Sequence, residues 1–404
     1  MNKLFLSILF TLLITHITFS QTNSIDITKV KQDFEKIISK LETNYVYYNK
    51  KDVDLNCLKK HYNSKIDGLK NKSEVLLFFE YLLDEFYDSH LHLNTNNKQS
   101  FRLYSPIYVS IKGDKTMISS FWKSQIENEF IINLINAEVL KFNGIDFNEV
   151  IENFPTHCQN KNNNEIRTWL SNKILAGRYN EPRIITIKTV SGKIETFDLD
   201  EIILKEETNV VTSFIQDSIG IIRINNSLGR IKTKRKFRKA LKKLKNTKGL
   251  IIDLRNTVDG GSTNIANPIA GHFTNKKQIF QKYKNSNTQF VDYIKPKKPY
   301  YSNPLIVLVG RWTGSMGEGL ASGFDGTGIG KIVGTEMLKL AGATKSYSFK
   351  NFNFGYQMPY IEVLHKDGYP REQFVPEHKV LLDDNKKDEF ILKGIKIINE
   401  FNKK

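Results

Sequence analysis

The sequence has almost no long hydrophobic runs. The single clear one, residues 4–14, is eleven residues long and follows Met1, Asn2 and Lys3. It is too short to span a bilayer as a helix, and the small residues Thr18 and Ser20 come where a signal peptidase cuts. We therefore predict a signal peptide at residues 1–20 and an exported protein, periplasmic or extracellular, without a transmembrane segment. No cysteine stands at the cleavage point to take a lipid.

Cysteine is equally scarce, with Cys57 and Cys158 the only two in 404 residues. Export permits a disulfide between them. However, they fall in regions that we assign to different domains, so we predict two unpaired buried thiols and keep the disulfide as the alternative.

Acidic residues are outnumbered, 43 against 60 Lys and Arg, for a formal charge of +17. Such a balance suits nucleic acid, but export argues against that partner. The densest basic run, residues 232–248, carries Phe237, Leu241 and Leu244 at helical spacing. We interpret it as an amphipathic helix with a solvated basic face, and attraction to an anionic surface stays open.

The pattern of apolar residues changes twice along the chain. Residues 25–100 begin with apolar residues every three or four positions, which predicts a helical region. Residues 101–205 contain alternating strands, with an Asn143-Gly144 hairpin and a second hairpin through Ser191-Gly192, which predicts a small β-rich module. Residues 210–400 alternate buried strands and helices, which predicts an α/β core with a mainly parallel sheet.

Ser315 lies where the buried strand 304–309 turns into a helix. The turn is rich in small residues, and the N–H of Met316 would face an oxyanion formed at Ser315. Ser315 and Glu318 also have the spacing of a capping box, so a helix cap is the alternative role. The paired Gly260 and Gly261 follow another strand of the same sheet, and sites form beyond such strand ends.

Three segments resemble the carboxyl-terminal processing (tail-specific) serine proteases: GLIIDLRNTVDGG, PLIVLVGRWTGSMGEGLASGF and KIVGTEM. The resemblance implies a crotonase-like ββα core, a PDZ-like insert at residues 101–205, and peptides or unfolded tails as substrates, with no cofactor or metal. It places the nucleophile at Ser315, with Glu318 matching. The oxyanion hole falls on Met316 with Gly260 or Gly261.

The resemblance leaves the general base open. The tail-specific branch uses a lysine in a G-K-G setting, where this chain has Leu340, and Lys339 is one residue away. The tricorn-like branch uses a Ser-His dipeptide and a distal Glu, which correspond to Ser89, His90 and Glu372. We favour His90 as base and Lys339 as the alternative. Further candidates for the triad are Glu377, His272 and His365.

His90 and His92 should share one face of a strand, but no third metal ligand is identifiable, so we predict no metal. A catalytically silent relative that binds peptides is the rival function, because the G-K-G lysine is missing. An acyl-CoA enzyme on the same fold is disfavoured by export. The oligomeric state is not encoded in any pattern that we recognise.

Overall fold

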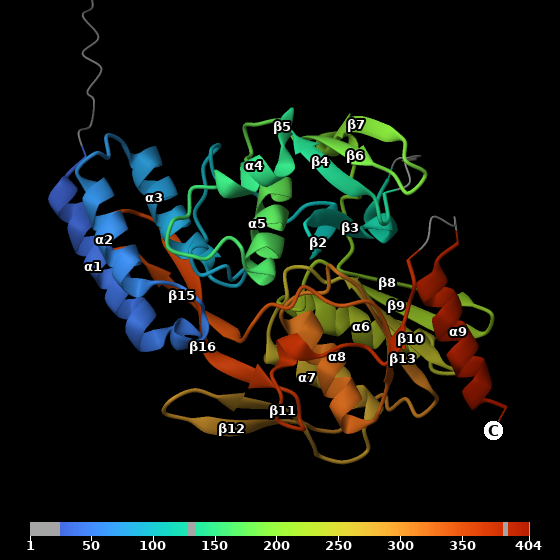
Figure 1. The fold of residues 1–404 in the computed structure, drawn as a ribbon. Coiled ribbons are helices and arrows are strands. Elements are labelled where there is room, and N and C mark those ends of the chain that lie inside the picture. The colour runs from blue at the N-terminus through green and yellow to red at the C-terminus, as the bar shows by residue number, and fades with distance from the viewer. Residues whose placement is uncertain (1–24, 128–133, 383–386, 404) are drawn as a thin grey trace, which may run out of the picture.

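The structure is a computed structural model that describes residues 25–127, 134–382 and 387–403. The predicted signal peptide lies outside the described residues. The helices and strands form several groups that lie side by side (Figure 1). The fold class is therefore mixed α/β.

The first three long helices are α1 (Ile27–Asn44), α2 (Leu55–Ile66) and α3 (Lys72–Asp84). The side chains of Asp26, Asp54 and Asn71 accept hydrogen bonds from N–H groups of the respective first turns, which is why the helices begin there. Their apolar faces form one core with residues of strands β15 (Ala343–Ser348) and β16 (Gly355–Leu364). The predicted helical region is confirmed.

The β-rich segment forms an antiparallel sheet in the order β2-β3-β4-β6-β7, with β5 beside β4. Both predicted hairpins are present, and Asn143 and Gly144 have the positive φ angles, 49° and 83°, that a tight turn needs. Two helices, α4 (Phe147–Glu152) and α5 (Asn164–Ala176), pack on this sheet. The strands are β2 (Ile107–Lys112), β3 (Lys115–Phe121), β4 (Glu138–Phe142), β5 (Ile145–Asp146), β6 (Ile184–Lys188) and β7 (Ile194–Asp198).

The predicted α/β region contains a sheet in the order β17-β14-β13-β10-β9-β8, parallel except for the β8–β9 pair. Its strands are β8 (Val211–Gln216), β9 (Ile219–Asn225), β10 (Leu250–Asn256), β13 (Leu305–Val309), β14 (Lys331–Gly334) and β17 (His378–Lys379). The mainly parallel sheet is confirmed.

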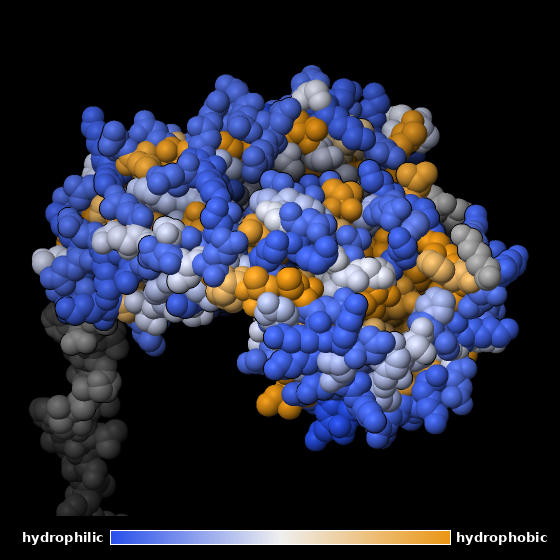
Figure 2. Space-filling view, turned by 90° about the horizontal axis from the view of Figure 1, so that it is seen from below, coloured by the Kyte–Doolittle hydropathy of each residue, from blue (hydrophilic) through white to orange (hydrophobic). Residues whose placement is uncertain are grey.

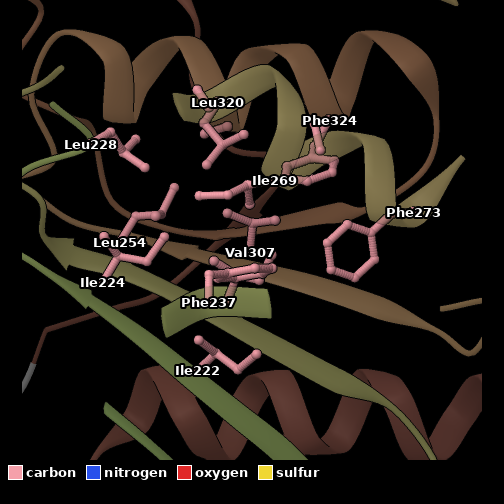
Figure 3. Packing of buried hydrophobic residues seen from close by; sticks show 14 of the residues in the cluster. Ile222, Ile224, Leu228, Phe237, Leu254, Ile269, Phe273, Val307, Leu320 and Phe324 are labelled. Atoms are coloured by element: carbon pink, nitrogen blue, oxygen red, sulfur yellow. The ribbon is translucent and has the colours of Figure 1, made fainter. Parts of the chain in front are cut away.

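Helices cover both faces of this sheet. One face packs against α6 (Ile231–Lys243), α7 (Thr263–Ala270) and α8 (Met316–Thr327), and Figure 3 shows Phe237, Ile269 and Leu320 meeting strand residues there. The other face packs against α9 (Glu389–Phe401). Both faces are therefore dry, which is why β13 is apolar throughout and β10 begins with three apolar residues. The buried Asp253 in the middle of β10 pairs with Arg255 at 2.8 Å.

A third sheet, in the order β1-β16-β11-β12 with β15 beside β16, was not predicted. It joins β1 (His92–Leu93) to β11 (Gln278–Lys284), β12 (Gln289–Ile294) and the late strands β15 and β16. Pairing between such distant segments leaves no local sequence pattern. Short 3₁₀ helices complete the elements: η1 (Tyr48–Lys50), η2 (Lys123–Gln125), η3 (Leu199–Glu201), η4 (Gly271–Phe273) and η5 (Arg371–Gln373).

The prediction of unpaired thiols was wrong, because Cys57 and Cys158 form a disulfide. The loop before α2 runs alongside residues 158–159: Val53 bridges Gln159, and the N–H of Asp54 donates to the Cys158 carbonyl at 3.0 Å. This long-range contact brings the two Cα atoms to 5.6 Å, although 101 residues separate them in sequence.

Among the described residues, no helix combines the length and apolar character needed to cross a bilayer. The face seen in Figure 2 is mostly hydrophilic, with several separate apolar areas.

Candidate active site

Ser315 occupies a backbone conformation that is rare for a residue with a side chain. Its φ is 47° and its ψ is −108°, between the end of β13 and the first residue of α8. Such conformations are costly and concentrate at functional sites. The predicted capping box is also present, with the Ser315 N–H donating to Glu318 Oε2 at 2.7 Å. The cap and the strained turn coexist, so capping does not compete with a chemical role for the hydroxyl.

The Gly260 loop lies directly against this serine. A Cβ added at Gly260, whose φ is +63°, would lie 2.4 Å from Ser315 Cβ and 3.2 Å from the Met316 nitrogen. At Gly261 an added Cβ would lie 2.2 Å from the carbonyl carbon of Leu228. The Gly314 N–H donates to the Thr257 carbonyl at 3.0 Å, which ties the serine turn to this loop.

The three N–H groups predicted for an oxyanion hole belong to these touching segments. In the part of the chain that the structure describes, the N–H groups of Met316, Gly260 and Gly261 donate to no backbone carbonyl. Donors without an internal acceptor beside a serine can bind an oxygen that becomes negative during reaction.

Glu318 connects the serine turn to the segment 339–342. Its Oε2 accepts from the N–H groups of Ser315 and Leu340, at 2.7 and 3.1 Å, and its Oε1 accepts from the Lys339 N–H at 2.8 Å. The side chain is 1% exposed. Burial raises the pKa of Glu318 to about 7, against the lowering effects of Arg371 and the three N–H donors.

His90 lies in the turn after α3 and is 5% exposed. Its Nδ1 is 2.9 Å from the carbonyl oxygen of Ala341. Since a carbonyl only accepts, Nδ1 carries the proton, and Nε2 of the neutral ring keeps its lone pair. Burial lowers the pKa of His90 to about 4, so the ring is neutral at physiological pH. This is the tautomer that a general base requires.

Ser89 and Glu372 have other partners than the histidine. Ser89 is exposed, and its Oγ accepts from Trp169 Nε1 at 3.1 Å. Glu372 Oε1 accepts from the Tyr47 hydroxyl at 3.0 Å, and burial raises the pKa of Glu372. The structure therefore puts the Ala341 carbonyl, and neither of these side chains, on His90 Nδ1.

Lys339 has a left-handed backbone, with φ at 60°, and its ammonium pairs with Glu336 at 3.0 Å. The Lys339 side chain is 42% exposed. A Ser–Lys mechanism needs a lysine removed from water and from acidic partners, so this environment is unlike that of a lysine base.

The remaining candidates lie elsewhere. His272 Nδ1 contacts the Pro299 carbonyl, His365 lies between Asp325 and Asp367, and Glu377 pairs with Lys331. His92 Nδ1 contacts the Leu93 carbonyl at 2.9 Å.

Ser315, Ser89, His90 and Lys339 line one cavity of about 500 Å³. Its wall combines the turn after α3, the beginning of the β-rich sheet, helix α5 and the serine turn. The other lining residues include Tyr104, Tyr108, Trp169, Asp259 and Trp312. Within the described residues, no hydrogen bond joins His90 to Ser315, so the two line the same cavity without direct contact through a hydrogen bond.

Arg371 was missed at the sequence level. It is 3% exposed, and its guanidinium donates to the carbonyls of Leu340 and Gly342, at 2.6 and 3.0 Å. Arg371 and His90 thus contact the three consecutive carbonyls of residues 340–342. The only hint in the sequence was that Arg371 is next to the candidate Glu372. An arginine on the surface can have the same neighbour, so this hint did not identify a buried residue.

Residues 218–377 match peptidase family S41, and residues 28–84 match the tricorn protease C1 domain. No similar sequence was found among curated proteins.

Two solved structures share the fold. Mature CPAF superposes with a TM-score of 0.61 at 14% identity, over 93% of this chain and 97% of that one. The photosystem II D1 C-terminal processing protease superposes with a TM-score of 0.53 at 13% identity, over 88% and 95%.

The fold and the matched segments define a serine peptidase. Residues 218–377 are those of a peptidase family S41 domain, and this match supports the tail-specific protease family that the motifs around Ser315 indicated.

Proposed function

We propose that this protein is an exported serine endopeptidase that cleaves peptides or unfolded protein tails through an acyl-enzyme on Ser315. The observation that carries the proposal is the contact between a strained Ser315, Gly260 and the Met316 N–H, on the cavity that His90 also lines.

The mechanism assigns one step to each group. His90 Nε2 takes the Ser315 proton as Oγ attacks the scissile carbonyl, and the N–H groups of Met316 and Gly260 or Gly261 hold the oxyanion. His90 then protonates the leaving amine, which leaves an acyl group on Oγ. Water hydrolyses this ester with His90 again as base. Ser89 and Glu372 shape the surroundings of His90 in this scheme, and Lys339 supplies the alternative base.

The role of Ser315 is tested with a fluorophosphonate probe, which labels activated serines. Wild type should be labelled, and Ser315→Ala should not. If wild type takes up no more label than Ser315→Ala at a concentration that labels a known serine peptidase, the proposal fails and the catalytically silent relative replaces it.

The role of His90 is tested by His90→Gln, with His92→Gln as the matched control. His92 lines the same cavity, but its Nδ1 is engaged by the neighbouring Leu93 carbonyl. We expect His90→Gln to lower kcat at least 1,000-fold and His92→Gln to change it less than tenfold. Loss of activity in Lys339→Met, with activity retained in His90→Gln, would transfer the base to Lys339.

Three further assignments belong to the same proposal. Residues 210–400 form a crotonase-like protease core, residues 101–205 a PDZ-like module, and residues 25–100 the helical region that contributes His90. The resemblance of the three motifs supports these boundaries, and the apolar stretch at residues 4–14 supports export to the periplasm or the exterior. Analysis of culture fractions for the processed chain tests the export.

A further inference from the structure

Helix α6 and its flanks carry a concentration of positive charge. No acidic residue occurs from residue 218 to residue 252, between Asp217 and Asp253. Over the same stretch, residues 230–248 contain eleven Lys and Arg: Arg230, Lys232, Lys234, Arg235, Lys236, Arg238, Lys239, Lys242, Lys243, Lys245 and Lys248. We call this set the basic face.

The fold turns this charge outward. Phe237, Ala240 and Leu241 pack into the core of the parallel sheet, and Figure 3 shows Phe237 among the sheet residues. The exposed members include Arg235, Lys239 and Lys242, one turn apart on the opposite side of the helix. Within the described residues, no member of the basic face pairs with a carboxylate inside the 4.0 Å of an ion pair. Among the described residues, ion pairs therefore leave this charge unneutralised.

Exposed apolar side chains lie at both ends of the basic face. Ile231, the first residue of α6, is 75% exposed. Ile215 of the edge strand β8 is 59% exposed. It pairs with Gly220 of β9, and a Cβ added at Gly220 would lie 3.2 Å from the Cβ of Leu244. Ile215 thus lies beside the last turn of α6.

From this combination we propose that the basic face of α6 is a docking surface for an anionic phospholipid membrane. Rows of Lys and Arg are attracted to acidic headgroups, and flanking isoleucines enter the boundary between headgroups and acyl chains. Nucleic acid would use the charges but not the isoleucines, and residues 218–252 contain no exposed aromatic ring on which a base could stack. None of the residues that line the catalytic cavity belongs to α6.

The test is co-sedimentation of the purified full chain with vesicles. Wild type should pellet with vesicles of phosphatidylcholine containing about a third phosphatidylglycerol and should not pellet with phosphatidylcholine alone. The triple variant Arg235→Glu, Lys239→Glu, Lys242→Glu should lose binding at least tenfold, because each charge near such a surface contributes about fivefold. Wild-type binding should also fall steeply with salt.

The matched control carries the same change in net charge on the amino-terminal helices. Lys36→Glu, Lys60→Glu, Lys65→Glu alters three exposed lysines of α1 and α2, and it should bind within threefold of wild type. Ile231→Ser should weaken binding severalfold without changing its salt dependence. Cleavage of a model peptide serves as the readout that all variants are folded.

Three outcomes would overturn the proposal. The first is no sedimentation of wild type with anionic vesicles, and the second is equal loss in both triple variants, which would reduce the effect to net charge. The third is displacement from vesicles by single-stranded DNA together with no effect of Ile231→Ser, which would make the occupant a nucleic acid.

Discussion

At the scale of single residues, the site depends on positions where only one residue type fits. Gly260 has a positive φ and touches Ser315, so an added methyl group both strains the backbone and collides with Ser315. Ser315 itself has a positive φ despite its side chain, and its N–H donates to Glu318 Oε2 at 2.7 Å in this conformation.

Gly260→Ala should therefore lower kcat/KM at least 100-fold. The control is Gly328→Ala at the end of α8, where φ is +68° but an added Cβ has no atom within 4 Å. Both variants should lose about 1 kcal/mol of stability from backbone strain, and Gly260→Ala should lose about 1–3 kcal/mol more from the collision with Ser315. Denaturant unfolding and peptide cleavage measure the two effects, and equal activities would contradict the placement of Gly260 at the oxyanion.

Glu318 predicts how activity depends on pH. Burial raises the pKa of Glu318 to about 7, so the group takes up a proton as pH falls through 7. A protonated Glu318 carboxyl cannot accept all three hydrogen bonds from the N–H groups of Ser315, Lys339 and Leu340. Protonation therefore weakens the link between the serine turn and the segment 339–342. Burial lowers the pKa of His90 to about 4, so His90 stays neutral over this range. An unperturbed histidine would instead titrate at about 6.5.

We expect wild-type kcat/KM to rise through about pH 7 and that of Glu318→Gln to rise through about pH 4. The glutamine cannot be protonated, which exposes the His90 titration. Its amide also replaces an acceptor by a donor, so its maximal activity should be about 10- to 100-fold lower. If the pH profile of kcat/KM had the same shape in Glu318→Gln as in wild type, Glu318 would not be the group that titrates.

At the scale of elements, the contact between α2 and the segment before α5 is fixed covalently. The Cys57–Cys158 disulfide closes a loop of 101 residues and joins the helical region to the β-rich region. Those two regions also meet at the cavity, through His90 on one side and Trp169 on the other.

The double variant Cys57→Ser, Cys158→Ser should have a free energy of unfolding about 2–5 kcal/mol lower than that of wild type, because the crosslink reduces the conformational entropy of the unfolded chain. Reductant should lower the Tm of wild type toward that of the double variant and leave the variant unchanged. If the double variant had the same Tm as oxidised wild type, the disulfide would add no stability.

At the scale of the whole molecule, the cavity depends on contacts between separate cores. Trp122, at the end of the first β hairpin, stacks on Trp312 with ring centroids 5.0 Å apart. The two rings and Val258 form one apolar cluster, so the β-rich region contacts both the serine turn and the glycine loop. The Trp312 Nε1 donates to the Ser105 carbonyl at 3.0 Å.

Trp122→Ala should cost about 3–5 kcal/mol of stability and also lower kcat at least tenfold. Phe237→Ala, in the main core and outside the cavity, is the matched control. It should lose similar stability and keep its kcat when both variants are assayed below their Tm. Equal loss of kcat in the two variants would mean that general destabilisation, and not support of the site, is responsible.

Local sequence alone was sufficient for the amino-terminal helices, both predicted hairpins, the parallel sheet and the strand-to-helix turn of Ser315. Each of these is encoded by the spacing of neighbouring apolar residues and by Gly or Asn at turns. Motif order also indicated the family that residues 218–377 match, because the segments around Gly260 and Ser315 lie within that one continuous match.

Tertiary structure alone decided the disulfide, the sheet that unites β1 with β11, β12, β15 and β16, and the surroundings of the candidate site residues. It placed the Ala341 carbonyl on His90 Nδ1, and it brought Arg371 and Glu318 to the segment 339–342. These contacts join residues that are between 21 and 251 positions apart. Their geometry depends on how separate cores pack, and that packing leaves no periodic trace in the sequence.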